Sequence, residues 1–143
     1  MKKSVVKCPV DVAVYSLSGD LIAELKDGIE SDISNEYGRF VVIRESYSGE
    51  YSKIICQSTN DELKIKLSAV GDGLVDYQSS SADAENIKAI DKLLVDNGNV
   101  IYADDEKYSV DTNGDGAADV YKEYVEKSND EYVRAESAEL SCD

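Results

Sequence analysis

The sequence predicts an antiparallel all-β domain, and three observations support this fold class. From residue 8 onward, short runs rich in Val, Ile and Tyr alternate with clusters of Gly, Asp, Asn and Ser at intervals of about ten residues, a spacing typical of sandwiches and barrels. Hydrophobic residues make up 42% of the chain, which is enough for a packed core. The 143 residues suffice for one such domain, or for a small domain with a tail.

The breakers between the apolar runs delimit eight predicted strands. They span residues 9–17, 21–26, 40–45, 51–57, 63–70, 74–79, 87–95 and 99–103. In the run 63–70, apolar residues at odd positions alternate with Lys64, Lys66 and Ser68. This alternation predicts a strand with one face in the core and the other in water.

Two segments carry turn or helix signals beside the strand pattern. Asn97 and Gly98 tolerate the positive φ angles of a type I′ turn, so they predict a hairpin. In residues 82–98, apolar side chains also recur at helical spacing, with Asp83 as a candidate cap and Gly98 as a candidate stop. We favour a strand because the flanking segments are β.

Charge and composition exclude several classes of function. Thirty Asp and Glu against fifteen Lys and Arg leave a formal charge of −15, which repels nucleic acid and anionic lipid. The chain has no His, so His-dependent nucleophilic catalysis and His-ligated metals are excluded. Carboxylate pairs such as Asp72 with Asp76 occur, but no nucleophile motif accompanies them, and we expect no catalysis.

The three cysteines are too far apart in the sequence for a metal knuckle or a dense disulfide framework. We expect Cys8 and Cys56 to be small buried side chains on strands, and Cys142 to be exposed and free. At most one internal disulfide can form.

The N-terminal residues 1–6 are predicted to form a tail. Residues 1–7 have the basic start of a signal peptide, but no apolar segment follows before Lys7, Pro9 and Asp11. No run approaches the roughly 20 apolar residues of a membrane span, so we expect no membrane insertion.

The order of three segments resembles that of a known family of modules. These segments are residues 7–15 (KCPVDVAVY) with SGDL after them, residues 61–67 (DELKIKL) with GDGLVDY after them, and a further apolar run. The chain is similar over residues 7–104 to an immunoglobulin-like β-sandwich module found near the C-terminal ends of large secreted or surface proteins of Firmicutes.

The resemblance implies a location and a role. It implies a non-catalytic module, a structural, spacer or adhesion part of a larger protein that is extracellular or on the cell surface. Its partners would then be other domains of that protein. The alternative is a module that binds a carbohydrate or a protein through exposed tyrosines.

The most specific chemistry lies in an acidic extension, residues 105–143, which contains the loop DTNGDGAAD at 111–119. Oxygen ligands at positions 1, 3, 5, 7 and 9 around a glycine at position 6 form a hard anionic cage suited to Ca²⁺. Position 12 is Lys122, so this is not an EF-hand loop. The alternative is a solvated, glycine-rich acidic linker.

The loop resembles the calcium loops of integrin-type propeller blades and thrombospondin type 3 repeats. This resemblance implies side-chain ligands from Asp111, Asn113, Asp115 and Asp119, and a carbonyl ligand from Ala117. The bound Ca²⁺ would be structural, because it would offset carboxylate repulsion and hold the extension against the sandwich.

Beyond the loop, residues 120–126 and 131–137 predict either a final hairpin or a frayed helix. Tyr121, Tyr124 and Tyr132 lie in this region. They either pack the extension onto the core or form an aromatic platform for a sugar.

Overall fold

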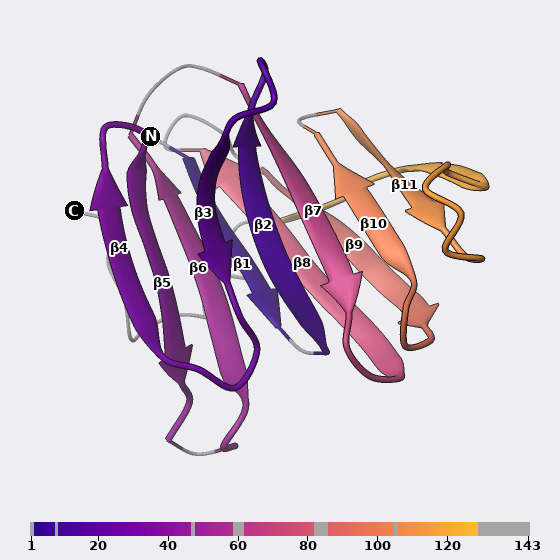
Figure 1. Cartoon of the computed structure of the whole chain (residues 1–143), viewed down its shortest axis with the longest axis horizontal. Helices are drawn as coiled ribbons and strands as arrows, with labels where there is room; N and C mark the ends of the chain where they lie inside the picture. Colours follow the sequence, from indigo (N-terminus) through magenta and orange to yellow (C-terminus); the bar gives the residue numbers. More distant parts are fainter. Residues whose placement is uncertain are drawn as a thin grey trace.

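The protein folds into two antiparallel sheets that pack face to face, as a computed structural model of residues 2–7, 9–46, 48–58, 62–81, 86–104 and 106–128 shows. All regular elements in these ranges are strands, which confirms the all-β class. In Figure 1, β2, β3 and β7 pass in front of β1 and β8, and β10 lies in front of β9.

The strands divide between two sheets. Sheet A has the order β13 (Val125–Ser128), β9 (Asn86–Val95), β8 (Gly73–Ser81), β1 (Lys2–Lys7), β6 (Tyr51–Gln57), β5 (Gly38–Arg44) and β4 (Ser31–Asn35). Sheet B has the order β12 (Val120–Glu123), β11 (Lys107–Asp111), β10 (Val100–Ala103), β7 (Leu63–Ala69), β2 (Val10–Ser16) and β3 (Leu21–Leu25).

The eight predicted strands correspond to β2, β3, β5, β6, β7, β8, β9 and β10. β7 has the predicted alternation, with every odd position buried and the residues between them at least partly exposed. The conflict over residues 82–98 is resolved for β9, which is a strand; residues 82–85 lie outside the described residues.

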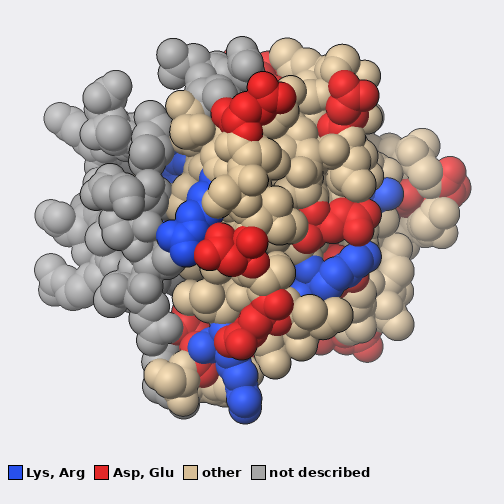
Figure 2. Space-filling model, turned by 60° about the vertical axis from the view of Figure 1, so that its left-hand side comes forward, with Lys and Arg blue, Asp and Glu red and all other residues tan. Residues whose placement is uncertain are grey.

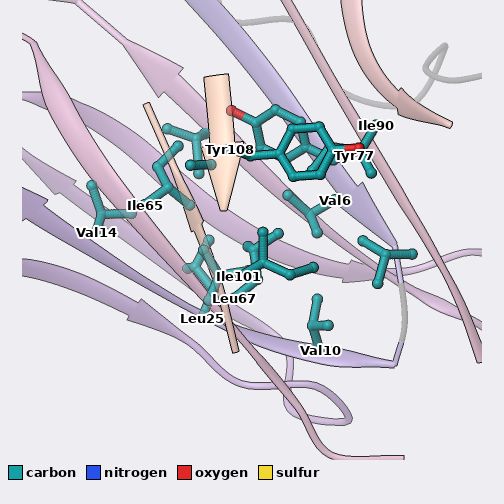
Figure 3. Packing of buried hydrophobic residues seen from close by; sticks show 14 of the residues in the cluster. Val6, Val10, Val14, Leu25, Ile65, Leu67, Tyr77, Ile90, Ile101 and Tyr108 are labelled. Atoms are coloured by element: carbon teal, nitrogen blue, oxygen red, sulfur yellow. The ribbon is translucent and has the colours of Figure 1, made fainter. Parts of the chain in front are cut away.

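The core fills the space between the sheets. In Figure 3, Val14, Ile65 and Leu67 from sheet B point into the same layer as Val6 and Tyr77 from sheet A. Each of these five side chains is buried. Burial of apolar surface between the sheets is therefore what holds the two layers together, at roughly 25 cal/mol per Å² removed from water.

The predicted tail at residues 1–6 is wrong, because β1 lies inside sheet A between β6 and β8. Its lysines suggested a solvated end, but Val5 and Val6 are buried on its two faces. A strand paired on both edges needs few apolar residues, since its backbone hydrogen bonds also stabilise it.

The predicted boundary at residue 104 is also wrong. β11 pairs with β10, and its Tyr108 and Val110 belong to the core, so this part of the acidic extension is integral to sheet B. Residues 120–126, which the sequence assigned either to one arm of a final hairpin or to a frayed helix, form neither one continuous strand nor a helix. β12 joins sheet B and β13 joins sheet A, so the chain crosses between the sheets there; residues 131–137 lie outside the described residues.

The Asn97-Gly98 turn does not form the predicted hairpin. Gly98 has the expected positive φ of 96°. However, the turn connects β9 of sheet A to β10 of sheet B, so it carries the chain from one layer to the other. The local conformation follows from the sequence, whereas the identity of the joined strands depends on the sheets.

Cys56 is a small buried side chain on a strand, as predicted, and the structure decides its bonding, which the sequence left open. Cys56 is disulfide-bonded, and its side chain is buried on the outer face of β6 beside Val5 and Ile54. Sequence spacing gave no sign of this bond, because distance along the chain does not limit how close two cysteines lie in a fold. Cys8 and Cys142 lie outside the described residues.

Candidate functional site

The predicted calcium loop connects two adjacent strands of sheet B. β11 ends at Asp111 and β12 begins at Val120, and the loop lies beyond β11 at the right of Figure 1. The pair Val110–Val120 closes its base, where the backbone N–H of Asp119 also donates to the carbonyl of Val110 (2.8 Å). The ends of the loop are therefore fixed by the sheet.

The carboxylate of Asp111 organises the loop. Its Oδ1 accepts hydrogen bonds from the backbone N–H groups of Asn113 (3.2 Å) and Gly114 (2.9 Å), and its Oδ2 accepts one from Gly116 (2.9 Å). Gly114 and Gly116 have φ angles of 77° and 87°, a region that favours glycine. The chain thus wraps around a side chain that is only 1% exposed.

The other predicted ligands have hydrogen-bond partners of their own within the loop. The amide oxygen of Asn113 accepts from the N–H of Asp115 (3.1 Å), and Oδ1 of Asp115 accepts from the N–H of Ala117 (2.9 Å). Oδ2 of Asp119 accepts from the N–H and the hydroxyl of Thr112, at 2.9 and 3.0 Å. These four predicted ligands (Asn113, Asp115, Ala117 and Asp119) are exposed, whereas Asp111, around which the loop wraps, is buried.

The described residues contain no group of three or more His, Cys, Asp or Glu side chains that could hold a metal ion. The structure therefore shows an ordered loop, stabilised by its own N–H donors, and does not bring its carboxylates together into a cage. Oδ2 of Asp111 and Oδ1 of Asp115 each accept one of these hydrogen bonds and keep a second lone pair for a cation, whereas Oδ1 of Asp111 and Oδ2 of Asp119 each accept two. Calcium binding stays a prediction, and it requires the carboxylates of Asp111, Asp115 and Asp119 to come closer together than they are here.

The pKa of Asp111 is lowered below its usual value of 3.8. Burial alone would raise the pKa, but the N–H groups of Gly116, Gly114, Asn113 and Asp115 together outweigh that effect by favouring the charged form. The folded state therefore binds a proton at this site less readily than the unfolded chain does.

Asp111→Asn is expected to destabilise the protein at neutral pH and to matter less in acid. With a lowered folded pKa, the stabilisation is complete above the unfolded pKa and is lost as the pH falls through the folded pKa. The Asn side chain could also place its NH₂ group, a donor, where a carboxylate oxygen now accepts the N–H of Gly116. Urea unfolding of both proteins in EDTA, from pH 7 down to about pH 2, tests this; a difference in stability that does not change with pH would contradict it.

The three predicted platform tyrosines do not form one surface. Tyr121 projects from β12 and is 68% exposed. Tyr124 packs against the core: its ring stacks on Tyr77 (centroids 5.9 Å apart, planes at 18°) and lies 5.3 Å from Tyr108. Its hydroxyl donates to the carbonyl of Asp104 at 2.6 Å. Tyr132 lies outside the described residues, so the packing alternative is confirmed for Tyr124 only.

Of the carboxylate pair considered for catalysis, Asp72 has a structural partner. Its Oδ1 accepts a hydrogen bond from the N–H of Asn97 (2.8 Å), which links the β7–β8 turn to the β9–β10 turn. The expectation of no catalysis stays a prediction.

Sequence reasoning missed a groove of about 410 Å³ on the outer face of sheet B. Tyr15, Tyr102 and Tyr121 line it together with Lys64 and Lys66. Strand alternation already placed the two lysines on an outward face. Only the strand order could bring them beside tyrosines from β2, β10 and β12.

Comparison of the chain with protein-family models, with curated proteins and with solved structures finds no match. Within the described ranges, the fold offers no helix that could cross a membrane.

Proposed function

We propose that the chain is a non-catalytic, immunoglobulin-like β-sandwich module, a structural or adhesion part of a larger secreted or cell-surface protein, and that its 111–119 loop binds Ca²⁺. The observation that carries the proposal is the position of the loop. It joins β11, whose Tyr108 and Val110 lie in the core, to β12 at the edge of sheet B. An ion bound there would stabilise the hairpin that ends this sheet.

The arrangement around Asp111 supports the choice of ion. The carboxylate at position 1 accepts the N–H of the glycine at position 6, so the turn that a calcium loop requires is already formed. The oxygen atoms at positions 1, 3, 5 and 9 belong to carboxylates and an amide, which suit a hard cation. A bound Ca²⁺ would offset repulsion among three carboxylates in a chain of charge −15.

The disulfide at Cys56 supports an extracellular location. Disulfides form and persist in oxidising compartments and are rare in the cytosol. The proposal therefore expects the gene to encode an export signal and further domains in the same polypeptide. A gene that encodes this domain alone, without any export signal, would contradict it.

Ca²⁺ is expected to raise the melting temperature of the protein by several degrees, and Asp115→Ala is expected to abolish this rise. Extracellular calcium sites have a Kd of about 10⁻⁴ to 10⁻³ M, so 10 mM Ca²⁺ would stabilise the fold by about 1.4 to 2.7 kcal/mol. Asp115 is exposed and accepts one hydrogen bond from Ala117, so its loss leaves the core intact.

The matched control for this test is Glu36→Ala, which removes one exposed carboxylate from the β4–β5 turn. Thermal melts with EDTA, Mg²⁺ and Ca²⁺ should show the same calcium-dependent rise in this variant as in the wild type. A rise that persists in Asp115→Ala would disprove the loop assignment, and so would the lack of any rise in the wild type.

The alternative function, binding of a carbohydrate or protein through Tyr121, Tyr124 and Tyr132, is not proposed with that set of residues. Tyr124 belongs to a core stack with Tyr77 and Tyr108, so its ring is not available to a ligand. Of the described tyrosines in the set, Tyr121 alone is exposed.

A further inference from the structure

The groove on the outer face of sheet B combines aromatic rings with cations. Its volume of about 410 Å³ lies within the range of small-molecule sites. Its lining residues come from five strands and adjoining turns, and the ones that matter for binding are Tyr15, Tyr102, Tyr121, Lys64, Lys66 and Lys107.

The strand register explains why these side chains lie together. Across the sheet, Tyr121 lies opposite Ser109, Ser109 opposite Tyr102, and Tyr102 opposite Lys66. Because Ser109 is small, the two tyrosines stand on either side of a low point. Tyr15 lies opposite Lys64 in the next row and forms the other side of the groove.

The tyrosine rings are accessible to a ligand. Tyr102 is 36% exposed and Tyr121 is 68% exposed, because both lie on the outer face of sheet B. A tyrosine ring offers a flat apolar surface and a polar hydroxyl, so it suits a ligand that has both apolar and polar faces.

The groove is locally cationic although the chain carries a charge of −15. Its described lining residues include three lysines and one carboxylate, Asp104. Within the described part of the chain, Lys64 and Lys66 form no ion pair. Lys107 lies at the rim opposite Glu123.

Elsewhere on the described surface, acidic and basic groups are mixed. On the face that Figure 2 shows, red acidic groups are spread over the surface with basic groups between them. A second hollow of about 180 Å³ beside the groove carries Asp11 and Glu24, and Asp11 there pairs with Lys26 at 3.7 Å. Lys26 and Lys66 also line that hollow and balance its two carboxylates, so an anionic ligand would be attracted more strongly to the groove, where lysines outnumber carboxylates.

We propose that this groove binds an acidic saccharide whose carboxylate is attached to the sugar ring, that is, a uronic acid oligomer. The apolar C–H face of a pyranose would stack on Tyr102 or Tyr121, and its carboxylate would pair with Lys66 or Lys64. Residues directly opposite on neighbouring strands have Cβ atoms about 4.5 to 5.5 Å apart, so the flexible side chain of Lys66 can bring its ammonium group to a sugar stacked on the ring of Tyr102. This spacing suits a carboxylate that is attached to the same sugar ring that stacks on the tyrosine.

An acidic peptide fits the groove less well. Peptides commonly gain affinity by adding a strand to a sheet edge, where backbone groups are unpaired. The two strands under the groove have no unpaired edge: β7 pairs with β2 and β10, and β10 pairs with β7 and β11. A saccharide does not need such backbone partners, since it binds through ring stacking and side-chain groups.

The test measures binding of a galacturonic acid hexamer by calorimetry, beside a neutral galactose hexamer, a sulfated galactose hexamer and hexaglutamate. All measurements are made in EDTA, because uronic acids bind Ca²⁺ and could bridge to the acidic chain. In this form the outcome is independent of the calcium loop, so the two proposals can fail separately.

Tyr102→Ala and Lys66→Gln are each expected to weaken galacturonate binding by about tenfold, which corresponds to about 1.4 kcal/mol. Lys122→Gln is the matched control: it removes the same charge from the strand of Tyr121, at a position that does not line the groove. It should bind as the wild type does. Raising the salt concentration should weaken binding of the acid and leave the neutral hexamer unaffected.

Three outcomes would overturn the proposal. The first is no binding of the galacturonate by the wild type, and the second is binding that neither Tyr102→Ala nor Lys66→Gln weakens. The third is equal binding of hexaglutamate or of the sulfated hexamer, which would mean that charge alone determines retention. Near-UV circular dichroism of each variant verifies that the fold is intact, and the two substitutions at separate positions keep the test decisive if one variant fails to fold.

Discussion

Gly38→Ala is expected to prevent folding or to lower the free energy of unfolding by about 3 kcal/mol or more. Gly38 begins β5 with a φ of 150°, opposite Gln57 of β6. A Cβ atom at this position would lie 1.9 Å from the carbonyl oxygen of Cys56 and 3.1 Å from the Cα of Gln57. These are backbone atoms of a paired strand, so no flexible side chain can move to relieve the clash.

Gly19→Ala is the matched control for this prediction. Gly19 also has a positive φ, 95°, but a Cβ there would meet nothing within 4 Å. Gly19→Ala is therefore expected to lower the free energy of unfolding only by the backbone strain, about 1 kcal/mol. Urea unfolding of both variants measures the difference, and the close approach of β5 to β6 is refuted if Gly38→Ala is no less stable than Gly19→Ala.

Asp27→Ala is expected to destabilise the protein by about 3 kcal/mol because it leaves a buried cation without its partner. Lys53 lies in β6 opposite Val42, its side chain is 0% exposed, and its ammonium group pairs with the carboxylate of Asp27. Asp27 follows β3, and its own backbone N–H donates to Oδ1 of Asp11 (2.7 Å). Loss of the carboxylate thus leaves Lys53 charged within the sandwich.

The double variant Asp27→Ala with Lys53→Met separates the cost of an unpaired charge from the value of the pair. Replacement of a buried ion pair by apolar groups is often close to neutral, so the double variant should recover most of the lost stability. Chemical denaturation of the wild type, both single variants and the double variant completes the cycle. A double variant no more stable than Asp27→Ala would show that the buried charge is not the cause.

The strands that the sequence predicted are those that bury an apolar face. β7 shows this most clearly, since its alternation reflects one buried and one solvated side. β11 was missed although it buries Tyr108 and Val110, because it was assigned to the acidic extension, whereas other missed strands lack an apolar alternation. β12 is exposed at every position and β4 buries none, because an edge strand is stabilised through hydrogen bonds to its neighbour as much as through burial. β1 was not predicted because its lysines indicated a solvated tail.

The two candidate sites, the 111–119 loop and the groove on sheet B, differ in whether the sequence could reveal them. The order of oxygen ligands and glycines in the 111–119 loop is a property of nine consecutive residues, so it was visible in the sequence, and the structure adds the hydrogen bonds that wrap the loop around Asp111. The groove on sheet B draws Tyr15, Tyr102 and Tyr121 from strands that are far apart in the sequence. No local pattern relates these residues to one another.

By itself, the sequence determined the all-β class, the buried face of most strands and the local shape of turns such as Asn97-Gly98. These features follow from side-chain alternation and backbone preference, which act between near neighbours in the chain. Tertiary structure alone decided which strands share a sheet, the burial of Lys53, the bonding of Cys56 and the meeting of tyrosines with lysines on sheet B. The reason is that strand partners are selected by the free energy of burying whole faces, a sum over residues distant in the sequence.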